Sequence, residues 1–168
     1  GGVGSFATQL AAHFGAHVTA VTSAGNRELA LRLGAEEVLD YRADALDDGL
    51  ARYDLVLEAG GSLPTRELAR LLTPEGVLAV VGAPRGDWIA PVTAVAGRAV
   101  ANRFSRKTIA SILARRDPDD LALLGDLAAS GAIRTVVGEV YPFERLADAV
   151  RASESGHVRG KLIVRVAP

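Results

Sequence analysis

The chain has 168 residues, of which 19 are basic and 20 acidic, so its formal net charge is −1. This balance gives no electrostatic reason to expect a nucleic-acid or anionic-membrane partner, because both favour a basic surface. The sequence contains no cysteine, which excludes disulfide bonds, thiolate metal sites and a cysteine nucleophile within it.

The apolar segments are short, and none approaches the ~20 residues that a membrane-spanning helix needs. No signal-peptide pattern opens the chain, and we expect a globular protein of the cytoplasm. The sequence holds no methionine and begins inside a glycine turn, GGVG. We therefore expect a fragment whose natural polypeptide extends further at its N-terminus.

Helical and strand-like stretches alternate along the chain. The first helix is expected to follow the opening glycines, with Phe6, Leu10, Ala11 and Phe14 at helical spacing and Gly15 as its end. Further helices are predicted at about 26–33, 43–51, 63–72, 91–104, 118–130 and 143–155. Strands are predicted at 17–22, 37–40, 53–58, 77–81, 108–113, 134–141 and 161–166, with a turn at 73–76.

This alternation is typical of a parallel sheet covered by helices on both faces. The expected fold class is α/β, a Rossmann-type doubly wound parallel sheet. Several strands end in glycine or small residues, at the edge where such sheets bind ligands. The first strand of the sheet is expected before residue 1, because a strand normally precedes such a glycine turn.

The opening glycines are typical of a phosphate-binding turn. Gly1, Gly2, Val3 and Gly4 match the second half of a G-x-G-x-x-G pattern, in which Gly1 lets the backbone approach a diphosphate. The free N–H groups and the dipole of the following helix stabilise the negative charge. Gly4 would allow the helix to pack closely on a strand. The alternative is a glycine-rich turn that binds nothing.

Dinucleotide sites contact the adenosine ribose at the end of the second strand, ~20 residues beyond the glycines. An acidic residue there bonds the ribose hydroxyls and repels a 2′-phosphate. Here the position carries Ser23, Asn26 and Arg27, with no acid before Glu28. Hydrogen-bond donors and a guanidinium suit a phosphate, so the pattern favours NADPH over NADH. The alternative is a hydroxyl turn beside a solvated Arg27.

Five motifs in a fixed order carry a family resemblance: GGVGSFATQLAAHFGAHVTAVTS, LRLGAEEVLDY, YDLVLEAGG, LLTPEGVLAVVGA and GHVRGKLIV. Together they resemble the zinc-independent quinone-oxidoreductase branch of the medium-chain dehydrogenase/reductases. The resemblance covers the whole chain, but only the C-terminal half of a typical member.

The resemblance implies roles for individual residues. Ser23 matches a residue that bonds the 2′-phosphate, and Asn26 stands where many members carry a phosphate-binding lysine, a departure for which Arg27 would compensate. Tyr41 matches a tyrosine beside the adenosine phosphate. The remaining positions match a backbone contact after a strand, the loop leading to the nicotinamide and the border of the nicotinamide pocket. The predicted cofactor-binding residues are Gly1, Gly2, Val3, Gly4, Ser23, Asn26, Arg27, Tyr41, Gly60, Gly82, Ala83, Ser111 and Ile112.

The resemblance also implies a division of the chain. Residues 1–115 would form an NAD(P)-binding domain truncated at its N-terminus, and residues 116–168 would return to an absent GroES-like catalytic domain. It further implies a homodimer, with strand 108–113 as the edge that pairs. No metal ligand and no catalytic side chain is assigned within this chain.

The expected activity is hydride transfer from NADPH to a quinone or to an activated C=C or carbonyl substrate, with this fragment inactive on its own. The alternatives are an enoyl-thioester reductase and a dinucleotide-binding module without turnover. A methyltransferase is disfavoured, because Ser23 stands where it needs an acid for the ribose. His13 and His17 lie on either side of Gly15, so a shared metal site is not expected.

Overall fold

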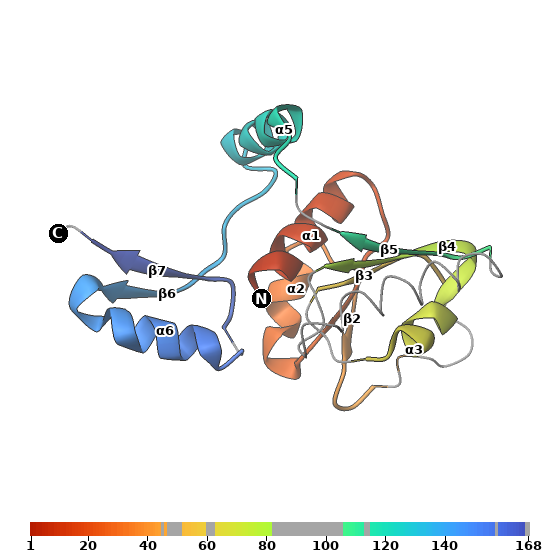
Figure 1. Ribbon diagram of the computed structural model, residues 1–168, viewed down its shortest axis with the longest axis horizontal. Helices are drawn as coiled ribbons and strands as arrows, with labels where there is room; N and C mark the ends of the chain where they lie inside the picture. Colours follow the sequence, from red (N-terminus) through yellow and green to blue (C-terminus); the bar gives the residue numbers. More distant parts are fainter. Residues whose placement is uncertain are drawn as a thin grey trace. The chain divides into compact units, whose positions relative to one another are not determined.

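The computed structural model describes residues 1–44, 46, 52–59, 63–81, 106–112, 115–156 and 158–166. Their helices and strands belong to two compact units, and Figure 1 labels the elements where there is room. The first unit comprises Gly1–Asp44 and Asp117–Pro168, and the second comprises Ala45–Arg116. Within the described ranges, every helix is too short or too polar to cross a membrane.

The first unit opens with a helix that starts directly at the glycine turn. Helix α1 spans Gly2–His13 and ends before Gly15, whose φ of +80° favours glycine, as the sequence predicts. The buried residues of the helix are Ser5 and Gln9, while Phe14 is 67% exposed. Both buried polar side chains are hydrogen-bonded, which offsets the cost of removing them from water.

Two short parallel strands follow this helix. β1 pairs with β2 along their whole length, with Ala20 opposite Val38. Ala30, Ala35 and Val38 are buried together, and Val18 packs against them. The small size of these side chains lets α2 lie close to the strand pair. The elements in chain order are β1 (Thr19–Thr22), the 3-10 turn η1 (Ala24–Asn26), α2 (Arg27–Arg32) and β2 (Glu37–Asp40).

The first unit also contains the C-terminal elements. The Asp117 side chain accepts hydrogen bonds from the N–H groups of Asp119 and Asp120, 2.9 and 3.4 Å away, and so caps α5 as the sequence predicts. β6 and β7 pair in parallel, and α6 packs against both strands. These elements are α5 (Pro118–Ala129), β6 (Val137–Pro142), the 3-10 turn η2 (Phe143–Arg145), α6 (Leu146–Glu154) and β7 (Lys161–Arg165).

The second unit is a three-stranded parallel sheet with one described helix. The strand order is β3-β4-β5, which leaves β5 at an edge. Leu72 and Leu78 are fully buried and pack with Leu68 of the helix and with Leu71. The elements are β3 (Tyr53–Glu58), α3 (Thr65–Arg70), β4 (Leu72–Val81) and β5 (Thr108–Ile112).

The predicted turn at 73–76 is wrong, because these residues belong to β4. Tyr53 lies opposite Leu72, and Leu55 lies opposite Val77, so the four residues between Leu72 and Val77 bulge out of the ladder. Gly76 permits this bulge, since a Cβ built there would lie 2.9 Å from the carbonyl oxygen of Tyr53. The Pro-Glu-Gly sequence therefore marks an irregularity within a strand.

Most of the other predicted elements are confirmed within one to three residues at their ends. The largest shift is at β4, which begins at Leu72 where the sequence predicts residue 77. β6 begins at Val137 where the sequence predicts residue 134. The predicted helix at 91–104 and most of the predicted helix at 43–51 lie outside the described residues.

All described strand pairs are parallel, which confirms the α/β fold class. The described strands are hydrogen-bonded in the orders β1-β2, β3-β4-β5 and β6-β7. The expected strand before residue 1 remains a prediction. The first unit contains the β1-β2 and β6-β7 pairs, and most of the predicted cofactor-binding residues in the described part of the chain belong to it.

Candidate functional site

The start of α1 presents backbone donors. Gly1 is the N-cap, and among the described residues no side chain caps the helix. The first helical bond runs from the N–H of Ser5 to the oxygen of Gly1 at 3.1 Å. The N–H groups of Gly2, Val3 and Gly4 precede that bond and have no intrahelical acceptor. Together with the positive end of the helix dipole, they make this end suitable for an anion.

Lys161 lies across the same helix end. A Cβ built on Gly2 would lie 2.8 Å from Nζ of Lys161 and 2.9 Å from its Cε. The lack of a side chain at Gly2 therefore leaves room for the lysine, whose ammonium group lies beside Gly2. Sequence reasoning missed Lys161, although it belongs to the motif GHVRGKLIV.

A surface hollow of about 500 Å³ opens beside this helix end. Its volume falls within the range of small-molecule sites, roughly 300–1,000 Å³. Neither Ser23 nor Arg27 belongs to its described lining. The hollow is lined by Gly1, Gly2, Val3, Leu146, Ala149, Val150, Ser153, Gly156, Val158, Gly160, Lys161, Leu162 and Val164.

The turn after β1 brings two predicted residues together. The Nδ2 of Asn26 lies 3.3 Å from Oγ of Ser23 and 3.4 Å from Oγ1 of Thr22, and donates to both. Asn26 is half-buried, and its amide ties the turn to the end of the strand. The Asn26 side chain thus has a structural role at the position where the family resemblance implies a phosphate-binding lysine.

Arg27 points toward the second strand. Its Nη1 donates to the carbonyl oxygen of Val38 at 2.9 Å. At the same turn lies a different guanidinium, that of Arg159. Its Nε donates to Oδ1 of Asn26 at 2.9 Å, and its Nη2 donates to the oxygen of Gly25. Sequence reasoning missed Arg159 as well.

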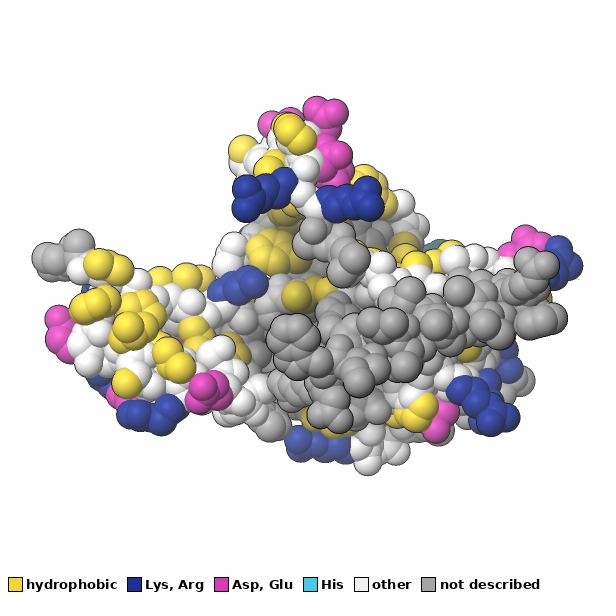
Figure 2. All heavy atoms as spheres, viewed as in Figure 1, with side chains coloured by type: hydrophobic (Ala, Val, Ile, Leu, Met, Phe, Trp, Pro, Cys, Tyr) yellow, Lys and Arg dark blue, Asp and Glu magenta, His cyan; other side chains and the backbone are white. Residues whose placement is uncertain are grey.

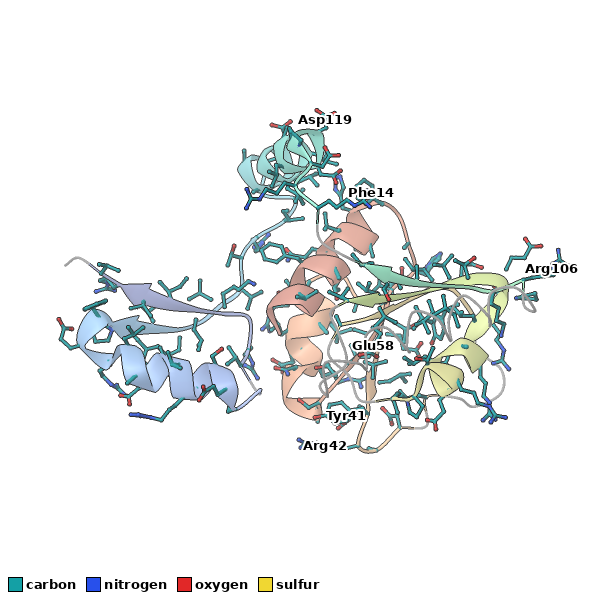
Figure 3. All side chains as sticks on the ribbon, viewed as in Figure 1. Phe14, Tyr41, Arg42, Glu58, Arg106 and Asp119 are labelled. Atoms are coloured by element: carbon teal, nitrogen blue, oxygen red, sulfur yellow. The ribbon has the colours of Figure 1, made fainter. Side chains whose placement is uncertain are left out.

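The end of β2 adds a carboxylate to this turn. Oδ2 of Asp40 accepts from the N–H of Ala24 at 3.1 Å, and Oδ1 accepts from the N–H of Arg42 at 3.0 Å. Tyr41 follows, half exposed, and its N–H donates to the oxygen of Thr22 at 3.3 Å. The guanidinium of Arg42 lies 5.4 Å from the centre of the Tyr41 ring, and Figure 3 shows the two residues at this turn. The end of β1 itself carries no acidic residue, as the sequence predicts, but Asp40 from the end of β2 places a carboxylate beside it.

Gln9 connects α1 to the segment that precedes β6. Its Nε2 donates to the oxygen of Arg134 at 3.0 Å, and its Oε1 accepts from the N–H of the same residue at 2.9 Å. A side-chain amide thus pairs with a backbone amide 125 positions away. This pairing satisfies the buried amide of Gln9.

Gly4 has no close neighbour in the described structure. A Cβ built there meets no heavy atom within 4 Å among the described residues. The strand that Gly4 is expected to contact was predicted before residue 1, so close packing at this glycine stays a prediction.

The remaining predicted residues belong to the second unit. Ser111 and Ile112 are exposed residues of β5, opposite Val80 and Val81 of β4. Gly60, Gly82 and Ala83 lie outside the described residues. The predicted nicotinamide side of the site therefore stays a prediction.

The two histidines weighed as a metal pair have other neighbours. Nδ1 of His17 lies 2.9 Å from both carboxylate oxygens of Glu36, and this contact raises the pKa of His17. His13 makes an edge-to-face contact with Phe14. In the described ranges, no three His, Asp or Glu side chains stand close enough to hold a metal ion.

The donors in the first unit match the chemistry of a dinucleotide phosphate. The start of α1 offers free N–H groups, and a side chain on Gly2 would fill the space that the Lys161 ammonium occupies. The turn at Ser23–Asn26 offers a hydroxyl, an amide and the Arg159 guanidinium. The segment from Val158 to Lys161 supplies one cation to each place.

Comparison with known proteins identifies the family of the chain. The family described as zinc-binding dehydrogenase matches residues 33–164. The chloroplast envelope quinone oxidoreductase homolog of Arabidopsis thaliana is 31% identical over 172 residues, covering 98% of this chain and 49% of the relative. The mitochondrial NAD(P)H oxidoreductase RTN4IP1 of Mus musculus is 32% identical over 182 residues, covering 99% and 46%. The chain thus spans about half the length of these curated relatives.

Solved structures agree on the fold. The quinone oxidoreductase of Coxiella burnetii superposes with a TM-score of 0.82 at 24% identity, covering 99% of this chain and 50% of that one. The Escherichia coli quinone oxidoreductase complexed with NADPH gives a TM-score of 0.73 at 21% identity, covering 99% and 54%. The fold and the family resemblance predicted from the sequence are therefore confirmed, and the chain belongs to the zinc-binding dehydrogenase family, with quinone oxidoreductases among its relatives.

Proposed function

We propose that this chain is the nucleotide-binding half of an NADPH-dependent oxidoreductase that reduces a quinone or an activated C=C or carbonyl compound. The observation that carries the proposal is the start of α1, where free N–H groups and the Lys161 ammonium meet beside the hollow. Further support comes from relatives named as quinone and NAD(P)H oxidoreductases.

In this proposal a bound NADPH supplies the hydride, and the residues of the chain bind and orient it. The N–H groups of Gly2, Val3 and Gly4, with Lys161, neutralise the diphosphate. Ser23 and its neighbours in the turn after β1 hold the adenosine end. Fixing both ends of a long ligand orients its reactive ring and lowers the entropic cost of the reaction.

NADH is the second candidate cofactor, and Asp40 favours it. The carboxylate of Asp40 contacts the N–H of Ala24 at the adenosine turn, and a nearby carboxylate repels a 2′-phosphate. Against this, both oxygens of Asp40 already accept hydrogen bonds from backbone N–H groups. The guanidinium of Arg159 contacts the same turn. We therefore favour NADPH.

An apolar surface supports the proposed packing of the C-terminal segment on a catalytic domain. Figure 2 shows hydrophobic side chains gathered on the outside of α6 and its two strands. Contiguous apolar surface of this kind is typical of an interface. The exposed apolar residues of this surface include Val137, Val140, Phe143, Leu146, Val150 and Ile163.

We also propose a homodimer that pairs through β5, the edge strand of its sheet.

Titration of the full-length protein with NADPH and with NADH tests the proposed function. We expect both to bind, with NADPH the tighter ligand, because only it carries the 2′-phosphate. Equal affinities would contradict the choice of cofactor, and the absence of binding would contradict the function. Oxidation of NADPH that depends on added quinone or enone would exclude a binding module without turnover, while reaction only with enoyl thioesters would favour that alternative reductase.

A further inference from the structure

The Arg159 guanidinium reaches the adenosine turn from the other end of the chain. Its Nε lies 2.9 Å from Oδ1 of Asn26, 133 positions earlier, and its Nη2 donates to the oxygen of Gly25. Two long-range bonds hold the charged group at the turn that sequence reasoning assigns to the 2′-phosphate.

The chemistry of this group suits a phosphate. A guanidinium carries five N–H donors in a fixed plane, and the two bonds to the turn engage two of them. Arg159 is exposed, so solvent and ligands reach it. The side chain of Asn26 is neutral and accepts from Arg159, and Arg27 donates to Val38. The charged group that is hydrogen-bonded to the Asn26 side chain is therefore the guanidinium of Arg159.

We propose that Arg159 binds the 2′-phosphate of NADPH and supplies the positive charge that the neutral side chain of Asn26 does not provide. Asn26 positions the guanidinium through its Oδ1 and also donates to Ser23. The inference rests on the proposed function. It assigns cofactor specificity to a residue that follows α6, and not to the β1 turn alone.

Lys161 provides the matched comparison. It lies two positions further along the same segment and contacts Gly2, at the turn assigned to the diphosphate. NADPH and NADH share the diphosphate, whereas only NADPH has the 2′-phosphate. Removing the charge of Lys161 is therefore expected to weaken both dinucleotides alike, and removing that of Arg159 is expected to weaken NADPH selectively.

The test measures dissociation constants of NADPH, NADH, 2′,5′-ADP and 5′-ADP by calorimetry, using the full-length protein. Arg159→Gln is expected to weaken NADPH and 2′,5′-ADP by roughly 10- to 100-fold, as for the loss of a charge-assisted bond. The affinities for NADH and 5′-ADP should change by less than about threefold. Arg159→Lys should retain part of the preference, because it keeps the charge but not the planar donors.

Controls separate binding from folding. Arg151→Gln removes an equal charge from α6, where Arg151 donates to Asp148, and should leave all four affinities unchanged. Adding Asn26→Lys to Arg159→Gln should restore the preference for NADPH, because it returns a cation to the turn. Unchanged melting temperatures would exclude unfolding as the cause.

Three results have distinct meanings. If Arg159→Gln weakens NADPH and NADH equally, or neither, the inference is wrong and Arg159 only braces the turn. If Arg159→Gln abolishes the preference for NADPH and the added Asn26→Lys restores it, the inference is supported. If the unaltered protein binds neither dinucleotide, the proposed function fails, and the inference fails with it.

Discussion

Gly160→Ala is expected to destabilise the protein by about 2–4 kcal/mol, combining the cost of a left-handed backbone with that of overpacking. Gly160 has a φ of +74°, and a Cβ built there would collide with the carbonyl oxygen of Val136 and lie 2.8 Å from its Cγ1. That carbonyl accepts the N–H of Lys161 at 2.8 Å, the bond that begins the β6-β7 ladder. The substitution should therefore also displace Arg159 and Lys161 and weaken dinucleotide binding.

Gly131→Ala is the matched control for this prediction. Gly131 has a similar φ of +77°, but a Cβ built there meets no heavy atom within 4 Å in the described part of the chain. Only the backbone cost remains, about 1–2 kcal/mol. Urea unfolding followed by circular dichroism measures both losses. Equal losses for the two alanines would show that the contact with Val136 has no consequence.

Leu78→Ala should destabilise the second unit by about 2–5 kcal/mol, the cost of a cavity in a close-packed core. Leu78 lies on the central strand β4, between Val56 and Ile109 in register, and has no exposed surface. Its side chain packs with Leu68 of α3. The loss should appear as a lower urea midpoint with an unchanged slope.

Leu78→Met is the control within the same site. Methionine keeps the volume and the apolar character, so the expected loss is below about 1.5 kcal/mol. A loss below about 1 kcal/mol for Leu78→Ala would contradict the core described here, because burial of that side chain would then contribute little.

The sequence predicts correctly those helices and strands that depend on interactions between residues close together in the chain. Glu37–Asp40 and Tyr53–Glu58 match their predicted strands, and the Asp117 cap forms the expected bonds. The sequence predicts a turn where β4 has its bulge, because Thr73-Pro74-Glu75-Gly76 has the residue types of a turn whether the chain reverses or continues. Only the pairing with β3 distinguishes the two outcomes.

Long-range contacts account for the parts of the site that the sequence did not predict. The amide of Gln9 pairs with Arg134, and the guanidinium of Arg159 contacts Asn26, across more than 120 positions in each case. Spacing along the chain carries no information on such pairs. The sequence signal for Arg159 and Lys161 is a pair of cations flanking a glycine in the motif GHVRGKLIV.

A crystal structure of the full-length protein with NADPH tests the central claim most directly. The account predicts diphosphate oxygens within hydrogen-bond distance of the N–H groups of Gly2, Val3 or Gly4, with Lys161 beside them. It also predicts the adenosine end against the turn that contains Ser23. A dinucleotide bound elsewhere, with the start of α1 still facing solvent, would contradict the account.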